Sequence, residues 1–302
     1  MNLALKIDVD IYRGTRDGVP HLVELLKKYE AGATFLFSLS PDHTGRAIKR
    51  VFRKGFLKKV RRTSVVSHYG IGTLLYGTLL PGPDIGGRCA EVMRNVQSAG
   101  FEVGIHTYDH IRWQDYVEHK DAAWTRREIE RARTRFREIF GTEARVHGAA
   151  GWQMNRHAYR LMQLLGFGYC SDTRGTHPFV PVYEAEVVAC PQLPTTLPTL
   201  DELIGTDGID VHNVAEHLLA MSKEMPPTGH VFTLHAELEG MKLAPVLELL
   251  LQGWRALGYR LVSLGDYFDA LADKNLPRHE VIRGSVPGRS GELALQGPRF
   301  LS

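Results

Sequence analysis

Short apolar segments alternate with longer amphipathic segments along most of this chain. The apolar segments at 3–10, 33–38 and 101–106 have the length and composition of buried strands. The segment 121–140 carries apolar residues at helical spacing and ends at a glycine, which is typical of a helix. Further strands are expected at 167–171, 230–235 and 259–264, and further helices at 18–30, 84–99, 155–165, 212–224 and 243–257, with a short segment of unassigned structure at 144–149. This alternation predicts an α/β fold with a parallel sheet, open or closed into a barrel.

The composition fits a folded globular protein. The chain has 302 residues, of which 43% are hydrophobic and 24% are charged, and these values exclude disordered, collagen-like and coiled-coil proteins. Its three cysteines include no Cys-x-x-Cys pair, which argues against a disulfide framework and against a cysteine-based zinc site. We expect a single domain over 1–275, an insertion at 41–82, and an irregular tail rich in Gly and Arg over 276–302.

The first apolar run does not have the pattern of an export signal. Lys6, Asp8 and Asp10 interrupt it too early for a signal-peptide core. No segment reaches the roughly 18 uninterrupted apolar residues that a membrane-spanning helix requires. We therefore expect the protein in the cytoplasm, or on a membrane surface that faces it.

Residues 46–62 hold nine Lys or Arg residues and no acidic residue. Without this segment the chain has 28 basic against 34 acidic residues, so its positive charge is local. Apolar residues are interleaved at helical spacing, and the apolar stretch 71–80, too short to span a bilayer, follows. This pattern is typical of an element that lies on an anionic membrane. The candidate membrane-binding residues are Arg46, Lys49, Arg50, Phe52, Arg53, Lys54, Phe56 and Lys58.

Two other interpretations of the basic segment stay open. It could be a solvated basic helix beside a core helix, or a surface that binds nucleic acid. The interleaved apolar residues and the lack of a recognisable nucleic-acid module lead us to expect no nucleic-acid partner.

Ionisable residues gather where the expected strands end. Asp8 and Asp10 end the first strand, His106 ends the third, and Asp172 and His235 follow two later ones. In a (β/α) barrel the carboxyl ends of the strands form the active face. The sequence therefore predicts one rim with ionisable groups from four strands.

The residue types at this rim suit metal-assisted hydrolysis. His106 and His110, separated by three residues, can bind one divalent metal, and a carboxylate would complete the ligand set. Of two neighbouring aspartates, one can bind the metal while the other takes a proton from water. His235 could act as a general acid, because the ordinary pKa of histidine is near physiological pH. Each feature alone also has a simpler explanation: a chance histidine pair, a solvated strand end, or a packed histidine.

The combination of the Asp8/Asp10 strand end, the His106/His110 pair and the late His235 resembles the polysaccharide deacetylase (NodB-homology, carbohydrate esterase) superfamily. Several longer stretches resemble bacterial deformylases of that superfamily that act on 4-deoxy-4-formamido-L-arabinose phosphoundecaprenol. These stretches are 6–20, 38–46, 102–114, 149–153, 171–179, 192–205, 235–240 and 281–289.

The resemblance implies a distorted NodB-type (β/α) barrel as the catalytic domain, and hydrolysis of an N-formyl group to formate and an aminoarabinose lipid. That lipid is used in lipid A modification, which confers resistance to polymyxin and other cationic peptides. By the same resemblance, Asp8 is the base, His235 is the acid, and Asp10, His106 and His110 hold one divalent metal ion. The metal would be zinc, cobalt, nickel or manganese. An undecaprenyl-phosphate substrate implies a peripheral protein on the cytoplasmic face of the bacterial inner membrane.

One departure from the superfamily concerns the base aspartate, which an arginine of the third motif commonly holds. Residues 147–153 contain no arginine. Arg13 or Arg174 could replace it, or Asp172 could act through another partner.

Other candidates for substrate binding are Trp152, as a sugar-binding aromatic, and Glu237, which could contact the sugar or the nascent ammonium. Two other functions stay open: a NodB-type deacetylase of an N-acetyl sugar, and a non-catalytic protein that binds a lipid carrier.

Overall fold

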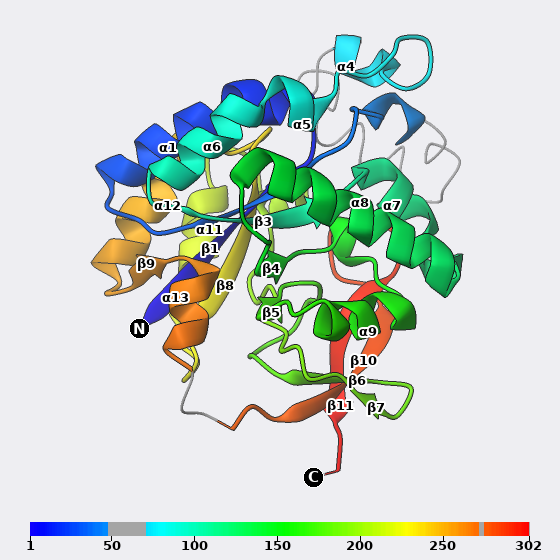
Figure 1. The fold of residues 1–302 in the computed structure, drawn as a ribbon. Coiled ribbons are helices and arrows are strands. Elements are labelled where there is room, and N and C mark those ends of the chain that lie inside the picture. The colour runs from blue at the N-terminus through cyan, green and yellow to red at the C-terminus, as the bar shows by residue number, and fades with distance from the viewer. Residues whose placement is uncertain (48–70, 272–274, 302) are drawn as a thin grey trace.

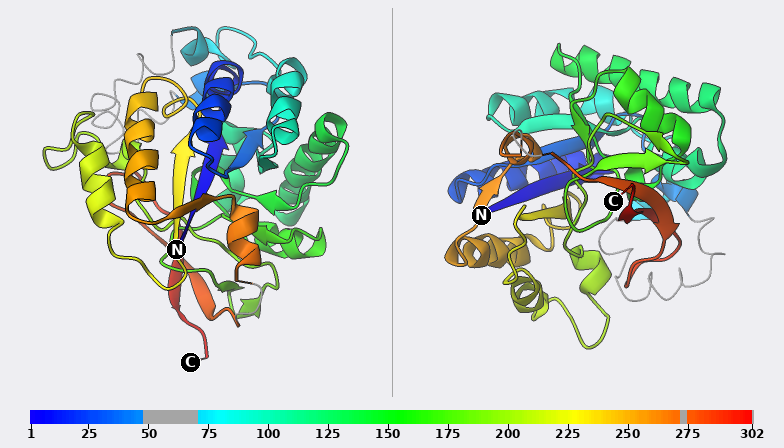
Figure 2. Two further views of the ribbon diagram at one scale, coloured as in Figure 1. Left: turned by 90° about the vertical axis from the view of Figure 1, so that its left-hand side faces the viewer. Right: turned by 90° about the horizontal axis from the view of Figure 1, so that it is seen from below.

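The computed structural model describes residues 1–47, 71–271 and 275–301. Its centre is a seven-stranded sheet in the order β5-β4-β3-β2-β1-β8, with β9 also paired to β1, and every pair is parallel. Figure 1 shows the helices packed around these strands, and the left view of Figure 2 shows β1 and β8 side by side at the centre. The strands are β1 (Asn2–Val9), β2 (Thr34–Ser38), β3 (Glu102–Thr107), β4 (Val146–His147), β5 (Tyr169–Cys170), β8 (His230–His235) and β9 (Arg260–Val262).

The helices largely follow the predicted ranges. The helix expected over 84–99 is two helices, because the backbone of Cys89 is not helical (φ −109°, ψ 13°). The helices are α1 (Val19–Lys28), α4 (Ile71–Leu75), α5 (Ile85–Arg88), α6 (Ala90–Ser98), α7 (His110–Tyr116), α8 (Ala122–Phe140), α9 (Arg156–Leu164), α10 (Leu200–Leu203), α11 (Val214–Met221), α12 (Ala244–Ala256) and α13 (Leu264–Asp269), with short turns η1 (Gly14–Gly18), η3 (Val117–His119) and η4 (Ala150–Trp152). Within the described ranges, no helix is both long enough and apolar enough to cross a membrane.

An irregular segment, 191–197, connects the two ends of the sheet. On one side, the N–H of Leu193 donates to Cys170 O of β5 (2.7 Å). On the other side, the N–H of Thr196 donates to Val231 O of β8 (3.0 Å). Pro191 and Pro194 have no N–H to donate, so this segment cannot form a regular strand. The result is the distorted (β/α) barrel that was predicted.

Side chains of β1 alternate between two environments, as the two-residue period of a strand requires. Leu3, Leu5 and Ile7 lie in the large apolar core that includes the outer helices. Ala4 belongs to a smaller apolar cluster with residues of β2, β4, β5, β8, β9 and α13. Lys6 and Asp8 follow Ala4 on this inner face, so the polar site begins directly above an apolar floor.

The carboxyl-terminal region forms part of a second, four-stranded sheet in the order β11-β10-β6-β7. Its strands are β6 (Val180–Tyr183), β7 (Glu186–Val187), β10 (Arg278–Gly284) and β11 (Leu293–Arg299). The expectation of an irregular tail over 276–302 is therefore wrong. Exposed and half-buried residues alternate along β10, and its strand partner β6 is almost a hundred residues away in the sequence. Local composition does not reveal such a distant pairing.

Candidate metal and active site

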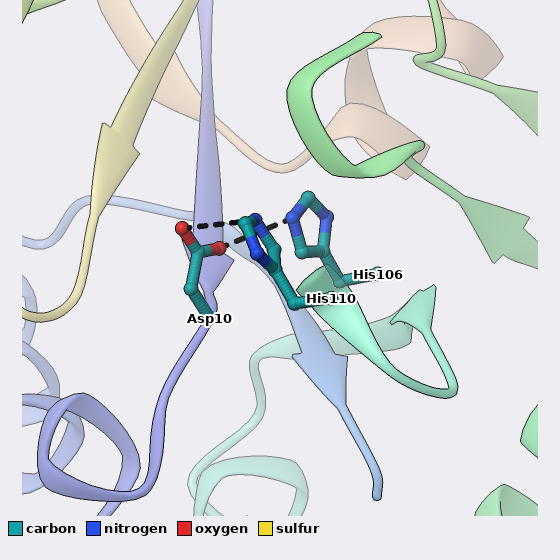
Figure 3. A group of neighbouring side chains, drawn as sticks. All are labelled: Asp10, His106 and His110. Atoms are coloured by element: carbon teal, nitrogen blue, oxygen red, sulfur yellow. Dashed lines mark ion pairs between the residues drawn. The ribbon is translucent and has the colours of Figure 1, made fainter. Parts of the chain in front are cut away.

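Asp10, His106 and His110 converge at the carboxyl ends of β1 and β3 (Figure 3). The Nε2 atoms of His106 and His110 lie 3.1 Å and 3.3 Å from the two carboxylate oxygens of Asp10. Their rings stack with centroids 5.3 Å apart. His110 is the first residue of α7, whose N-terminus is fixed by the Asp109 carboxylate, which accepts the N–H of Arg112 (3.0 Å). The predicted histidine pair and the Asp10 carboxylate are thus close enough together to bind a single ion.

The environment of this triad suits a cation. Burial opposes ionisation of Asp10, but His110 and His106 beside it hold its pKa well below the ordinary value. Burial likewise opposes protonation of His106, yet Asp8 and Asp10 raise its pKa. Among the described residues, buried Asp10 Oδ1 has no hydrogen-bond partner beyond its 3.1 Å ion-pair contact with His106 Nε2. Two imidazoles and a carboxylate with such an acceptor fit a divalent metal such as zinc or cobalt.

Asp8 lies beside this triad and is paired with Lys6. Lys6 Nζ is 3.3 Å from Asp8 Oδ2, and the two side chains are 0% and 4% exposed. Lys6 Nζ also donates to Ser171 O (3.1 Å). The lysine stem passes against Gly148, where a Cβ would lie 3.0 Å from Lys6 Cε. Asp8 Oδ1, in contrast, has no hydrogen-bond donor in the described chain and points toward His106 Nδ1 at 3.6 Å.

Lys6, from β1 and not from residues 147–153, is therefore the cation that contacts Asp8, and sequence reasoning missed it. The three residues considered for this role lie elsewhere. Arg13 is 3.9 Å from Asp17, and Arg174 binds Glu202. Asp172 binds His147. The available signal was a lysine within an apolar strand, two positions before Asp8 and hence on the same face.

His235 ends β8 directly beside Asp8 in the register of the sheet. Its Nδ1 is buried, with no hydrogen-bond partner in the described part of the chain. Its backbone N–H donates to Glu239 Oε2 (2.8 Å). Burial raises the pKa of Glu239 to about 7, although His235 opposes this shift. His235 thus lies beside Asp8 and Asp10, and its role as general acid stays a prediction.

Glu237 is buried rather than part of a solvated loop. Burial, together with the negative charge of Asp10, raises its pKa well above the ordinary value. Space beside it is limited, since a Cβ on Gly14 would lie 2.7 Å from Glu237 Oε2. A neutral Glu237 next to the triad can donate a proton in a hydrogen bond, and its contact with substrate stays a prediction.

The turn η4 carries Trp152, which is 1% exposed and has a left-handed backbone (φ 53°). Asp172 fixes the start of this turn, because its Oδ1 accepts the N–H of Ala149 (2.8 Å) and contacts His147 Nδ1 (2.8 Å). Asp172 and Trp152 are therefore parts of the packed support of the site. A direct contact of either with sugar stays a prediction.

Most predicted membrane-binding residues lie outside the described residues: Lys49, Arg50, Phe52, Arg53, Lys54, Phe56 and Lys58. Arg46 is described and is exposed. The segment after the gap exposes two leucines, Leu79 (80%) and Leu80 (45%).

Comparison with known proteins agrees with this geometry. A family described as polysaccharide deacetylase matches residues 8–170. The chain belongs to the polysaccharide deacetylase family. A protein of Shewanella sediminis, named "Probable 4-deoxy-4-formamido-L-arabinose-phosphoundecaprenol deformylase ArnD", is 36% identical over 97% of this chain and 94% of its own. A protein of the same name from Wigglesworthia glossinidia brevipalpis is 30% identical over 94% of this chain and 98% of its own.

Solved structures share the fold of this chain at low sequence identity. A polysaccharide deacetylase homologue from Mycobacterium smegmatis superposes with a TM-score of 0.64 at 17% identity, over 94% of this chain and 95% of its own. A family 4 acetyl xylan esterase from Clostridium thermocellum, solved with a cobalt ion, gives a TM-score of 0.51 at 11% identity, over 90% and 92% of the two chains.

Proposed function

We propose that this family member hydrolyses the N-formyl group of 4-deoxy-4-formamido-L-arabinose phosphoundecaprenol. The products are formate and the aminoarabinose lipid, which serves lipid A modification and polymyxin resistance. The observation that carries the proposal is the convergence of Asp8, Asp10, His106, His110 and His235 at one rim. Two proteins named as probable deformylases of this substrate are 36% and 30% identical to the chain over more than nine-tenths of its length, and this similarity supports the substrate.

Asp10, His106 and His110 would hold the metal, here proposed as zinc, cobalt, nickel or manganese. Such an ion supplies Lewis-acid activation of the attacking water and of the formyl oxygen. Asp8, which has an unpartnered Oδ1, accepts a proton from the water as the new C–O bond forms. His235 donates a proton to the nitrogen as the C–N bond breaks, because an amide nitrogen leaves only when it is protonated.

The oxyanion that develops during attack requires a hydrogen-bond donor, and the turn 149–152 lies beside the site. The N–H of Ala149 already donates to Asp172, and that of Trp152 donates to Ala149 O (3.0 Å). Neither of these two groups is available for that role.

Mass spectrometry of a short-prenyl formamido-arabinose phosphate, incubated with metal-loaded protein beside its N-acetyl analogue, tests the function. We expect the protein to remove the formyl group from the first compound and to leave the N-acetyl analogue intact. Cleavage of both compounds would favour a broader deacylase of an N-acetyl sugar. Cleavage of neither by protein with confirmed metal would reject the substrate, and would favour a non-catalytic lipid-carrier-binding protein.

The same substrate places the protein at the membrane, and we propose a peripheral position on the cytoplasmic face of the bacterial inner membrane. Exposed Arg46, the first residue of the basic segment, and the exposed Leu79 and Leu80, which follow that segment in the sequence, support this proposal. Flotation on anionic vesicles should weaken when Leu79 and Leu80 are replaced by Ser. The matched control is Leu164→Ser, which changes another exposed leucine (69%) on α9. Equal flotation of all three proteins would contradict the proposal.

A further inference from the structure

Three cationic side chains surround the indole ring of Trp152. The ring centroid lies 5.1 Å from Lys6 Nζ, 5.1 Å from Arg174 Cζ and 4.5 Å from Arg289 Cζ. Lys6 in turn contacts Asp8. One buried ring therefore connects the proposed base with two guanidinium groups that the mechanism does not use.

The two arginines differ in how completely they are bonded. Arg174 Nη1 donates to both oxygens of Glu202 (2.7 and 2.8 Å), its Nη2 donates to Leu197 O (3.1 Å), and its Nε donates to Thr195 O (3.3 Å). Every nitrogen of Arg174 thus has a partner inside the protein. This arginine is a structural residue that holds the 195–202 segment.

Arg289 has a weaker contact with the same carboxylate. Its Nη1 lies 3.4 Å from Glu202 Oε1, beyond the usual hydrogen-bond length. Glu202 already carries the two short bonds from Arg174, so one negative charge is shared between two cations. The Arg174–Glu202–Arg289 cluster has an excess of one positive charge.

The backbone keeps Arg289 in this place. Gly288 has φ +76°, and a Cβ there would lie 2.0 Å from Glu202 O, so the chain packs closely against α10. The Arg289 side chain is 13% exposed, which leaves it reachable from solvent but largely dehydrated. A guanidinium in such a setting binds an oxyanion strongly, since charge-assisted bonds gain from reduced hydration.

We propose that Arg289 binds the phosphodiester that joins the sugar of the substrate to its lipid. The inference rests on the proposed function. In that substrate the phosphate and the formamide are separated by one pyranose ring. Lys6 contacts both Asp8 and the Trp152 ring, so with the formamide beside Asp8 we expect the phosphate, one sugar ring away, to face the cations around Trp152. A phosphodiester carries one negative charge, which matches the excess of the cluster.

The test compares two substrates of metal-loaded protein: a short-prenyl phosphodiester of 4-formamido-arabinose, and the neutral methyl glycoside. We expect the wild type to prefer the phosphodiester. Arg289→Gln should reduce the ratio of the two kcat/KM values by about 10- to 100-fold, mainly through KM, as expected for loss of one charged hydrogen bond. Arg289→Lys should restore part of the ratio. Arg278→Gln, which changes an exposed arginine at the start of β10, should leave it unchanged.

An equal fall in kcat/KM for both substrates in Arg289→Gln would show that Arg289 only packs against Trp152, and would overturn the proposal. An unchanged ratio would also overturn it. If the wild type hydrolyses neither substrate, the proposed function has failed, and calorimetry of the same two compounds then decides the phosphate site by itself. The site is supported if the wild type binds the phosphodiester more tightly than the methyl glycoside and Arg289→Gln loses this preference. It is rejected if the wild type and Arg289→Gln bind the phosphodiester with equal Kd values.

Discussion

Lys6 Nζ lies 3.3 Å from Asp8 Oδ2, on the same face of the same strand, and both side chains are almost completely buried. The cation that holds the proposed base therefore comes from β1 itself. Because both residues belong to one central strand, the orientation of Asp8 depends on the sheet and not on a loop.

Lys6→Met should lower the free energy of unfolding by about 3–5 kcal/mol, because it leaves the Asp8 carboxylate buried without its cation. The same variant should lower kcat at least about tenfold with a smaller change in KM, since Asp8 loses its orientation. Lys6→Arg should retain most activity. Urea unfolding and steady-state kinetics measure both effects. Unaltered stability and kcat in Lys6→Met would show that the ion pair has no role.

His235→Ala and His106→Ala should separate proton donation from metal binding. We expect His235→Ala to keep its metal and lose about 10²- to 10⁴-fold in kcat, the usual contribution of a general acid. His106→Ala should lose both metal and turnover, because one of the three ligands is missing. Metal analysis of the purified variants measures metal binding, and formate release measures turnover. A His235→Ala protein with near wild-type turnover would contradict the assignment.

The sequence predicted most strands of the parallel sheet and their ends, because buried parallel strands are short apolar runs with local signals. The convergence of Asp8, Asp10, His106 and His235 followed from parallel topology, in which all carboxyl ends share one edge. Side-chain partners were harder to predict. Lys6 was overlooked because a lysine in a strand is ordinarily an exposed residue, and only its fold-dependent neighbours make it a buried partner of Asp8.

The C-terminal sheet was missed for a different reason. β10 and β11 contain glycine, arginine and other polar residues, and the pairing of β10 with β6 joins segments almost a hundred residues apart. Local pattern carries no information on such a contact. Arg289, which lies between these strands, therefore looked like part of an irregular tail.

Asp172→Asn tests whether this residue supports the turn or contacts substrate. Its carboxylate accepts the N–H of Ala149 and a bond from Gln192 Nε2 (3.2 Å), and an amide cannot accept on both sides. The free energy of unfolding should fall by about 1–3 kcal/mol, with little change in KM. Thermal unfolding and kinetics measure the two quantities. A raised KM at unchanged stability would instead indicate direct contact with substrate.

Glu239 should make stability depend on pH. Burial raises the pKa of Glu239 in the folded protein to about 7, above its ordinary value of 4.5. The folded state therefore keeps a proton that the unfolded chain loses. Stability falls as the pH rises from about 4.5 to about 7, and then levels off.

Glu239→Gln removes this titration. In chelated protein, the unfolding free energy of wild type should fall relative to the variant by roughly 3 kcal/mol between mildly acidic and mildly alkaline pH. Urea unfolding across that range measures the difference. Parallel pH curves for the two proteins would show that Glu239 ionises normally.

We propose that one metal ion, held by Asp10, His106 and His110, supports hydrolysis of the formamide. The most direct measurement is formate release by chelated protein as metal is returned in known amounts per chain. We predict no release without metal, a linear rise with bound metal, and saturation at one ion per chain. Formate release by metal-free protein, or release that does not follow the bound metal, would contradict the account.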